Sequence, residues 1–269
     1  MLWNKWDKSA NLDGAPMDKE SRSGKNNPRR WYPKLRSPAL SRVRSFNNYA
    51  KQLSDDEIEA GLHRKRVGAY WQEVGKLQFD FLVSQGLQPD HRLLDVGCGA
   101  LRGGLHFIRY LEPGHYYGID LNQSLLKAGI EHEVPRAGLT DRMPATNLRQ
   151  TDMFACDDFG VTFDFMLSVS VFSHLPLNHL RLCLHQLAKV TKPGASYFTT
   201  FFEAADALPL DERQRRPDRK GWTYSHRDPF HYTQADLEWV AGVGPWKFVY
   251  VGDWSHRRGQ KMAQFIRTD

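Results

Sequence analysis

The chain of 269 residues is long enough for one large domain plus an appendage, and its 41% content of hydrophobic residues is enough for a buried core. No apolar run reaches the roughly 18 residues of a membrane-spanning helix, and the N-terminal stretch lacks the apolar core of a signal peptide, so we expect a soluble, cytoplasmic protein. Its cysteines, Cys98, Cys156 and Cys183, are scattered and odd in number, which argues against a disulfide framework and against a zinc site.

The positive net charge of +6 is concentrated in residues 1–50. That segment carries eleven Lys and Arg against four Asp and Glu, whereas the rest of the chain carries 26 against 27. Because it is also rich in Ser, Asn, Pro and Arg, we interpret it as a basic, partly disordered tail. A second interpretation stays open, in which Trp31, Tyr32 and the nearby arginines contact an acidic partner, RNA or membrane lipid.

Two helices are predicted between this tail and the first strand. Ser54 and Glu57 form a capping box for a helix that runs through about Arg66. A second helix, ending near Gly86, is predicted by apolar residues at helical spacing, namely Tyr70, Val74, Leu77 and Phe81.

A strand, a glycine-containing turn, a helix and a second strand follow. The apolar pair at 93–94 predicts a buried strand that leads to Asp95, and residues 97–99 form a tight turn. The helix carries one apolar face, made of Leu101, Leu105, Ile108 and Leu111. The second strand, 116–119, leads to Asp120. This order of elements is half of a nucleotide-binding α/β fold.

The glycines indicate which nucleotide this turn accepts. A dinucleotide fingerprint needs a third glycine where this chain has Arg102, and a P-loop needs a Gly-Lys-Ser/Thr sequence that is missing here. With a dinucleotide and a P-loop nucleotide disfavoured, the ligand that remains possible is an adenosine without phosphates. Gly97 and Gly99 would let the backbone approach it, and Asp120 could accept hydrogen bonds from both ribose hydroxyls.

The sequence Asp-Val-Gly-Cys-Gly at 95–99, with Asp120 closing the next strand, resembles motif I and the following acidic position of the class I S-adenosyl-L-methionine (SAM) methyltransferases. The resemblance is to the bacterial small-molecule type. It implies a Rossmann-like, mostly parallel α/β sheet of seven strands with an antiparallel last strand and helices on both faces. It also implies SAM as the cofactor, with Asp120 at the ribose and Asp95, Gly97, Cys98, Gly99 and Leu121 in the same pocket.

The resemblance implies further cofactor contacts on either side of this motif. A helix before the first strand covers the cofactor in related enzymes, which makes Tyr70 and Trp71 candidates, although both could equally be ordinary core residues. Asp152 follows a strand predicted at about 145–150 and matches the position that accepts a hydrogen bond from the adenine amino group. Met153 would then pack on the adenine ring.

The fourth strand, 163–169, is expected to exit toward the transferred methyl group, where Ser168 is a candidate contact. Amino-methyltransferases of nucleic acid carry an acid or Asn, then Pro, Pro and an aromatic residue at this place, and the cytosine-C5 type carries a Pro-Cys pair. Here residues 168–171 are Ser, Val, Ser and Val. Both absences argue against a nucleic-acid acceptor.

Two histidines are candidate catalytic residues. His174 lies at the predicted mouth of the site, where a neutral imidazole could take a proton from an acceptor hydroxyl or amine, or could instead bond within its own loop. Segment 203–232 is too long for a simple connection, and in this family the corresponding insertion tends to shape the acceptor pocket. His231, near its end, is therefore a second candidate. A carboxylate acceptor would require neither histidine.

The remaining elements complete the sheet and define the predicted domain, 51–269. They are a strand at 196–202, a helix from Thr233 to Val240, and strands at 247–251 and 260–266. We interpret the loop between the last two strands, with Trp254 and His256, as a solvated hairpin connection.

The leading hypothesis is methyl transfer from SAM to a hydroxyl, amine or carboxylate of a small molecule or of a sugar-containing, glycan-type metabolite. One alternative is an RNA or protein methyltransferase that uses the basic tail. Another is a SAM-binding regulatory protein without turnover. The sulfonium methyl is already activated, so the protein has chiefly to align the acceptor with it and exclude water, and no metal is required.

Overall fold

The computed structural model describes residues 48–68 and 70–269, which belong to one unit of the chain, residues 44–269. The predictions for residues 1–47, including those for Trp31 and Tyr32, lie outside the described residues. Within the described ranges no helix is both long enough and apolar enough to cross a membrane.

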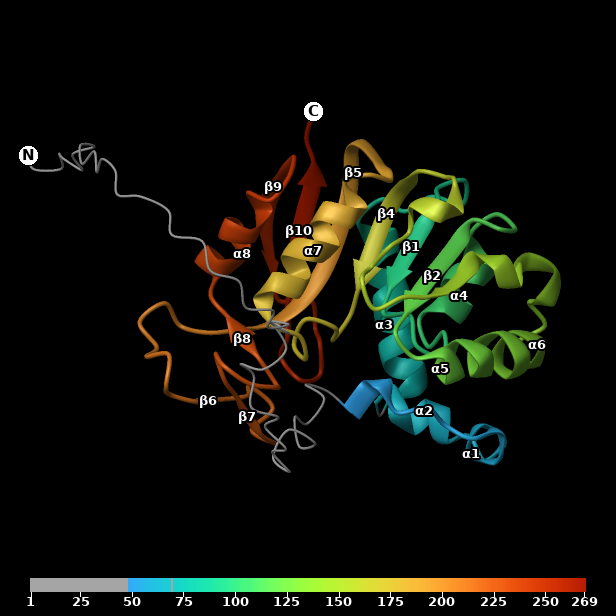
Figure 1. Ribbon diagram of the computed structural model, residues 1–269, viewed down its shortest axis with the longest axis horizontal. Coiled ribbons are helices and arrows are strands. Elements are labelled where there is room, and N and C mark those ends of the chain that lie inside the picture. The colour runs from blue at the N-terminus through green and yellow to red at the C-terminus, as the bar shows by residue number, and fades with distance from the viewer. Residues whose placement is uncertain (1–47, 69) are drawn as a thin grey trace, which may run out of the picture. The chain divides into compact units, whose positions relative to one another are not determined.

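One mixed sheet organises the domain (Figure 1). From edge to edge its strands are β3 (Leu148–Gln150), β2 (Tyr116–Asp120), β1 (Leu93–Val96), β4 (Phe163–Ser168), β5 (Thr191–Glu203), β10 (Lys261–Arg267) and β9 (Trp246–Gly252). Strands β1 to β5 pair in parallel, and β10 is antiparallel to both β5 and β9. The predicted fold class is confirmed. A short strand, β8 (His231–Tyr232), adds to it by pairing with the end of β5.

Helices cover both faces of this sheet, which is why β1 is buried along its whole length. One face packs against α3 (Trp71–Ser84), α4 (Gly104–Tyr110) and α5 (Gln123–Ala128), which contribute Leu82, Phe107 and Leu126 to one core cluster. The other face packs against α7 (Leu177–Leu187) and α8 (Gln234–Ala241), which contribute Leu184 and Leu237 to a second cluster.

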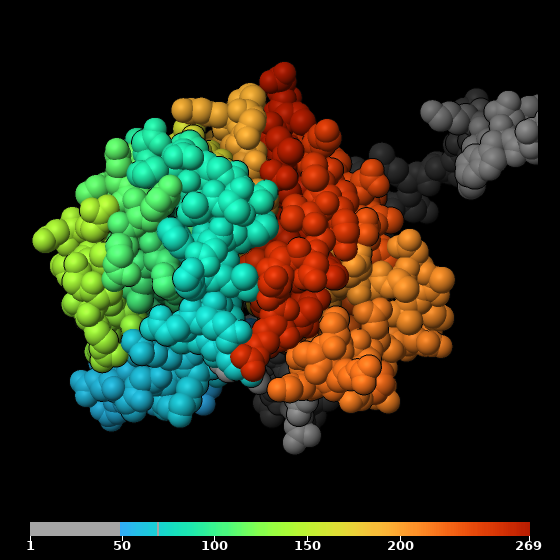
Figure 2. All heavy atoms as spheres, turned by 180° about the vertical axis from the view of Figure 1, so that it is seen from behind, coloured from blue at the N-terminus to red at the C-terminus, as the bar shows by residue number. Residues whose placement is uncertain are grey.

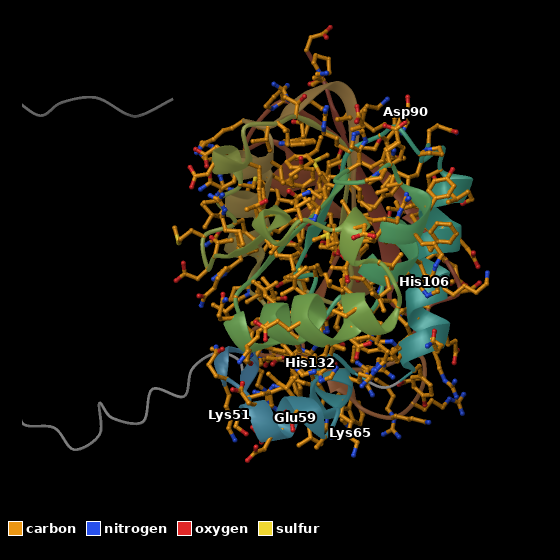
Figure 3. All side chains as sticks on the ribbon, turned by 90° about the vertical axis from the view of Figure 1, so that its right-hand side faces the viewer. Lys51, Glu59, Lys65, Asp90, His106 and His132 are labelled. Atoms are coloured by element: carbon orange, nitrogen blue, oxygen red, sulfur yellow. The ribbon has the colours of Figure 1, made fainter. Side chains whose placement is uncertain are left out.

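Two short helices, α1 (Asp55–Glu59) and α2 (Leu62–Arg66), replace the single helix predicted here. The capping box of Ser54 and Glu57 is present, but Gly61 adopts φ +75° and divides the helix. Figure 3 shows Glu59 and Lys65 of these helices at the opposite end of the domain from Asp90, which precedes β1. The carboxyl ends of the parallel strands therefore face α1 and α2.

The helices next to β1 and β2 also differ from the expected bounds. Leu101 has φ +66° and lies in the turn, so α4 begins only at Gly104. After α5 the chain continues as a π-helix, η4 (Gly129–Glu133), and as α6 (Val134–Arg136). In residues 48–68 and 70–269, four 3₁₀ turns complete the helical segments: η3 (Asn48–Ala50), η5 (Thr140–Arg142), η6 (Ala145–Asn147) and η7 (Asp157–Phe159).

The insertion 203–232 contains a small hairpin, β6 (Gln214–Arg215) with β7 (Trp222–Thr223), before it reaches β8. The backbone N–H of Phe230 donates to the carbonyl of Ser173, 2.8 Å away, which fastens the end of the insertion to the loop after β4. Figure 2 shows the cyan α3 beside the red C-terminal segments, and the rings of Phe81 and Trp254 meet there with centroids 5.6 Å apart.

Candidate functional site

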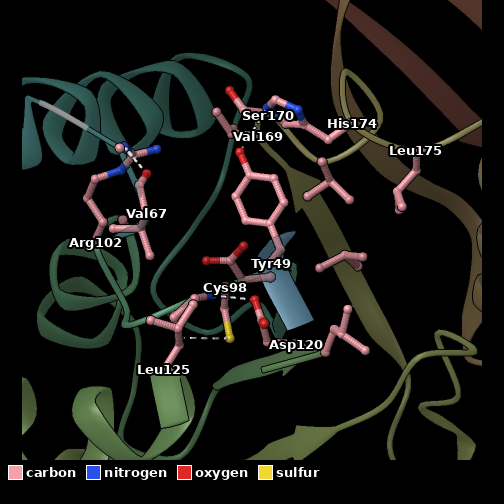
Figure 4. A pocket seen from close by; sticks show the side chains of 18 of the residues that line it. Tyr49, Val67, Cys98, Arg102, Asp120, Leu125, Val169, Ser170, His174 and Leu175 are labelled. Carbon is pink, nitrogen blue, oxygen red and sulfur yellow. Dashed lines mark hydrogen bonds between the residues drawn. The ribbon is translucent and has the colours of Figure 1, made fainter. Parts of the chain in front are cut away.

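A cavity of about 710 Å³ lies at the carboxyl ends of β1, β2 and β4 (Figure 4). Ten of the residues singled out from the sequence line it, namely Tyr70, Asp95, Gly97, Cys98, Gly99, Asp120, Leu121, Asp152, Met153 and His174. Three non-glycine residues in its wall, Tyr70, Phe154 and Ser170, have positive φ values of +69°, +55° and +60°. Such strained backbone is found preferentially at functional sites.

The turn after β1 brings bare backbone to the cavity. Gly97 and Gly99 have φ values of +77° and +55°, a region that side chains disfavour. A Cβ on Gly97 would lie 2.5 Å from a methyl group of Val171, and a Cβ on Gly99 would lie 2.7 Å from one of Val67. Both glycines are thus required by space as well as by backbone conformation. The thiol between them, Cys98, is buried, which raises its pKa well above the usual range and keeps it protonated.

Asp120, at the end of β2, is oriented by backbone amides. Its Oδ2 accepts a hydrogen bond from the N–H of Gly99 and its Oδ1 one from the N–H of Asn122, each at 2.8 Å. Burial raises the pKa of Asp120, and these hydrogen bonds oppose the rise. Each oxygen keeps a lone pair for a further donor from the cavity.

Asp95, at the end of β1, is buried and accepts a hydrogen bond of 2.8 Å from the hydroxyl of Tyr116. Burial raises the pKa of Asp95 to about 7, and the Tyr116 hydrogen bond opposes the rise. Asp152 and Met153 also line the cavity. The Met153 side chain is 52% exposed, which leaves an apolar surface available to a planar ring.

His174 forms the centre of a hydrogen-bonded group of three. Its Nδ1 lies 2.6 Å from Oδ1 of Asp228, and its Nε2 lies 3.1 Å from the hydroxyl of Tyr49. Figure 4 shows the Tyr49 ring in the cavity with its hydroxyl toward His174. The backbone carbonyl of Tyr49 accepts a hydrogen bond of 2.6 Å from the side chain of Asn122. Asn122 therefore links the segment that carries Tyr49 to Asp120.

The wall formed by the β9–β10 loop is basic. Arg102 and His256 line the cavity together with Arg258, and Arg102 donates to the carbonyl of Val67 at 2.9 Å. Burial, followed by the charge of Arg258, lowers the pKa of Arg102 to about 10 and that of His256 to about 4. At neutral pH His256 is therefore uncharged.

The loop itself is not the solvated hairpin connection that the sequence suggested. Trp254 and His256 are buried and stack with ring centroids 5.3 Å apart. The Trp254 indole also donates to the carbonyl of Gln260 at 3.0 Å and packs on Phe81 of α3. These contacts turn the loop inward, so that prediction was wrong.

Known sequences identify the family to which this architecture belongs. Residues 94–197 match a family described as a methyltransferase domain. A ubiquinone biosynthesis O-methyltransferase of Hahella chejuensis is 29% identical over 163 residues, 59% of this chain and 60% of that protein. A phthiotriol/phenolphthiotriol dimycocerosates methyltransferase of Mycobacterium tuberculosis is 31% identical over 122 residues, 45% of this chain and 39% of that protein. The matched domain supports the assignment to the class I SAM-dependent methyltransferases, which the sequence resembles.

Solved structures of class I methyltransferases share the fold. A magnesium protoporphyrin IX methyltransferase from Synechocystis aligns with a TM-score of 0.53 at 15% identity, over 86% of this chain and 92% of that one. An amino pentose methyltransferase from Micromonospora echinaspora aligns with a TM-score of 0.53 at 18% identity, over 81% and 99%. Both were crystallised with SAM bound.

Two residues proposed for the methyltransferase cofactor site lie elsewhere. Ser168 is fully buried, and its hydroxyl bonds those of Tyr197 and Thr199, both 2.7 Å away, instead of reaching the cavity. Trp71 packs beside Ile58 and lies under the guanidinium of Arg64, outside the cavity wall. The predictions for these two side chains are corrected accordingly.

His231 is likewise not an acceptor contact. Its side chain is 4% exposed and its Nδ1 bonds the hydroxyl of Thr223 at 2.9 Å, while its backbone pairs with β5. Burial lowers its pKa. His231 therefore stabilises the insertion, and the insertion reaches the cavity wall through Asp228, which contacts His174.

Proposed function

We propose that this chain transfers the methyl group of SAM to a hydroxyl, amine or carboxylate of a small molecule or sugar-containing metabolite. One observation carries the proposal: the amide-oriented carboxylate of Asp120 and the imidazole of His174, whose Nδ1 lies 2.6 Å from Asp228, line a single cavity. The first is suited to a nucleoside, and the second to an acceptor that must lose a proton.

The residues present fit the cofactor. Asp120 would accept hydrogen bonds from the ribose, Asp152 one from the adenine amino group, and Met153 would pack on the adenine ring. The turn at 97–99 would lie against the methionine portion, where a Cβ on either glycine would collide with Val171 or Val67. SAM supplies a methyl group that is already activated, so the protein has to align the acceptor and exclude water.

The hydrogen-bond geometry defines what His174 can do. The carboxylate of Asp228 can only accept, so Nδ1 of His174 carries the proton toward it and Nε2 is left as an acceptor. With this tautomer the Tyr49 hydroxyl, 3.1 Å away, would be the donor to that nitrogen. An acceptor hydroxyl or amine would deliver its proton to Nε2 directly or through Tyr49. Of the three acceptor groups, this arrangement favours the two that lose a proton.

The names of similar proteins support a small-molecule acceptor. They include an O-methyltransferase of ubiquinone biosynthesis and an amino pentose methyltransferase. The chain spans 60% of the length of the first of these relatives, so its activity rests on the site described above.

Two measurements test the proposal. Calorimetry with SAM and with S-adenosylhomocysteine should show a single site per chain. Labelled SAM incubated with fractions of a cell extract should then label a small molecule in the presence of the protein. Absence of cofactor binding would overturn the assignment. Label found only in RNA or protein would favour a macromolecular acceptor, and binding without any labelled product would favour a regulatory role.

A further inference from the structure

The β9–β10 loop places positive charge and a buried histidine, His256, in the wall of the cavity. A Cβ built on Gly68 would lie 3.5 Å from Nη1 of Arg102 and 3.7 Å from Nη2 of Arg258, so the two guanidiniums flank one point of the wall. His256 is 8% exposed, and its Nδ1 has no hydrogen-bond partner among the described residues. A buried polar atom without a partner is costly, so a hydrogen bond to this imidazole would be a gain if the ring turned toward the cavity.

The acids near this wall are already paired. Asp218 lies 3.3 Å from Arg216, and Glu73 pairs with Arg257 at 2.9 Å. Asp95 accepts its hydrogen bond from Tyr116. Arg258 has no acceptor within residues 48–68 and 70–269, although it is half-buried. The charge of Arg258 is therefore not compensated by an acid, and the like charge of Arg102 lies beside it.

The position of Arg258 associates it with the acceptor side of the cavity. Gln260, two residues later, accepts hydrogen bonds from Ser170 at 3.0 Å and Thr200 at 2.7 Å, which fastens the loop to the exit of β4. That exit is where the proposed methyl transfer takes place. Arg258 also acts electrostatically on the Tyr49 hydroxyl, more strongly than Arg102 does.

We propose that Arg258 and His256 bind an anionic group, a carboxylate or phosphate, on the methyl acceptor. A guanidinium recognises both groups through paired N–H donors, and the neutral imidazole adds one further hydrogen bond. The inference rests on the proposed function, because it places this anion beside a bound cofactor. Arg102 directly follows the glycine turn, so it remains available to the cofactor's own carboxylate.

The test uses the full chain saturated with S-adenosylhomocysteine. Benzoate and inorganic phosphate are titrated as anionic probes and benzamide as a neutral probe with the shape of benzoate, with binding followed by calorimetry and by the fluorescence of Trp254, which stacks on His256. We expect both anions to bind, benzamide to bind at least tenfold more weakly, and Arg258→Gln to weaken benzoate at least tenfold. Arg258→Lys should lose less affinity for benzoate than Arg258→Gln, because lysine keeps the positive charge.

Arg149→Gln is the control, because its guanidinium pairs with Asp158 and does not line the cavity. It should change benzoate affinity less than threefold, and Arg258→Gln should change S-adenosylhomocysteine affinity less than twofold. Equal binding of benzoate and benzamide, or no binding of either anion, would overturn the inference. So would a tenfold loss of S-adenosylhomocysteine affinity in Arg258→Gln, since the anion would then be the cofactor's carboxylate. A wild-type chain that binds no S-adenosylhomocysteine would instead refute the proposed function.

Discussion

The Nδ1 atom of His174 lies 2.6 Å from a carboxylate oxygen of Asp228, although 54 residues separate them in the sequence. The loop after β4 and the end of the insertion meet because the Phe230 N–H donates to the Ser173 carbonyl, one residue before His174. The insertion therefore contributes to the site through a carboxylate that fixes the imidazole, and not through the histidine at its end.

Replacing His174 by Gln should reduce kcat by about 10²- to 10⁴-fold, the range associated with loss of a general base. Asp228→Asn should reproduce part of this loss, because an amide can hold the imidazole in the wrong tautomer. Initial rates with an acceptor found in the labelling screen would measure both effects. Cofactor affinity, measured by calorimetry, should stay within twofold. Unchanged kcat in His174→Gln would show that the acceptor reacts without losing a proton to this residue.

Asp120→Ala should weaken binding of S-adenosylhomocysteine by about 1 to 3 kcal/mol, or roughly 5- to 150-fold, because the ribose hydroxyls lose a charged acceptor. Calorimetry on the folded variant checks this. Asp158→Asn is a suitable control, since Asp158 pairs with Arg149 away from the cavity and is exposed. Equal affinities for the wild type and Asp120→Ala would show that the nucleoside binds elsewhere.

The half of the cavity proposed for the nucleoside could be predicted because the residues that form it are close together in the sequence. Positive φ confines Gly97 and Gly99 to small residues, and Asp120 follows a buried strand, so neighbouring residues indicate their roles. The parallel order of strands then brings Asp152 to the same edge.

Apart from His174, the half of the cavity proposed for the acceptor could not be predicted, because it is assembled from distant segments. Tyr49 was assigned to the tail, yet Asn122 holds its backbone and His174 bonds its hydroxyl. The loop with His256 looked polar, but a buried Trp254 turns it inward. The composition Trp-Ser-His-Arg-Arg was the available signal, since an aromatic residue beside a cluster of bases is unusual in a solvated turn.

Gly97→Ala should destabilise the fold and weaken the binding of S-adenosylhomocysteine. Its Cβ would meet a Val171 methyl group at 2.5 Å in a backbone conformation that costs an L-residue about 1 to 2 kcal/mol. Gly160→Ala separates these two effects, because Gly160 has φ +67° but no atom within 4 Å of its Cβ position. Chemical denaturation should show a larger loss for Gly97→Ala. Equal losses of stability in the two variants would mean that Val171 moves aside at no cost in free energy.

Ser168→Ala should lower stability by about 1 to 3 kcal/mol and leave cofactor affinity unchanged. The hydroxyl joins Tyr197 and Thr199 inside the sheet, so its removal leaves buried polar groups with fewer partners. Denaturation and calorimetry on the same preparation measure the two quantities separately. A loss of affinity without a loss of stability would restore Ser168 to the cofactor site.

Glu133 attaches the N-terminal helix α2 to η4 and should make stability depend on acid pH. Its carboxylate is 1% exposed and accepts hydrogen bonds from His63 at 2.7 Å and from Arg64 at 2.7 and 2.6 Å. Burial would raise the pKa of Glu133, but these hydrogen bonds outweigh it and the pKa is lowered. The carboxylate therefore stabilises the fold fully above the unfolded-state pKa of about 4.3, and this contribution is lost as pH falls through the lower folded-state pKa.

Glu133→Gln should consequently cost about 1 to 3 kcal/mol at pH 7, less than a fully buried ion pair because Arg64 is partly exposed. The difference from the wild type should shrink as pH falls below about 4. Denaturation at a series of pH values measures it, with Asp55→Asn as the control, because Asp55 pairs with Lys127 on the surface. A difference that is constant from pH 7 to pH 3 would mean that Glu133 acts through packing and not through its charge. Protonation of the wild-type carboxylate would then leave its advantage over the amide unchanged.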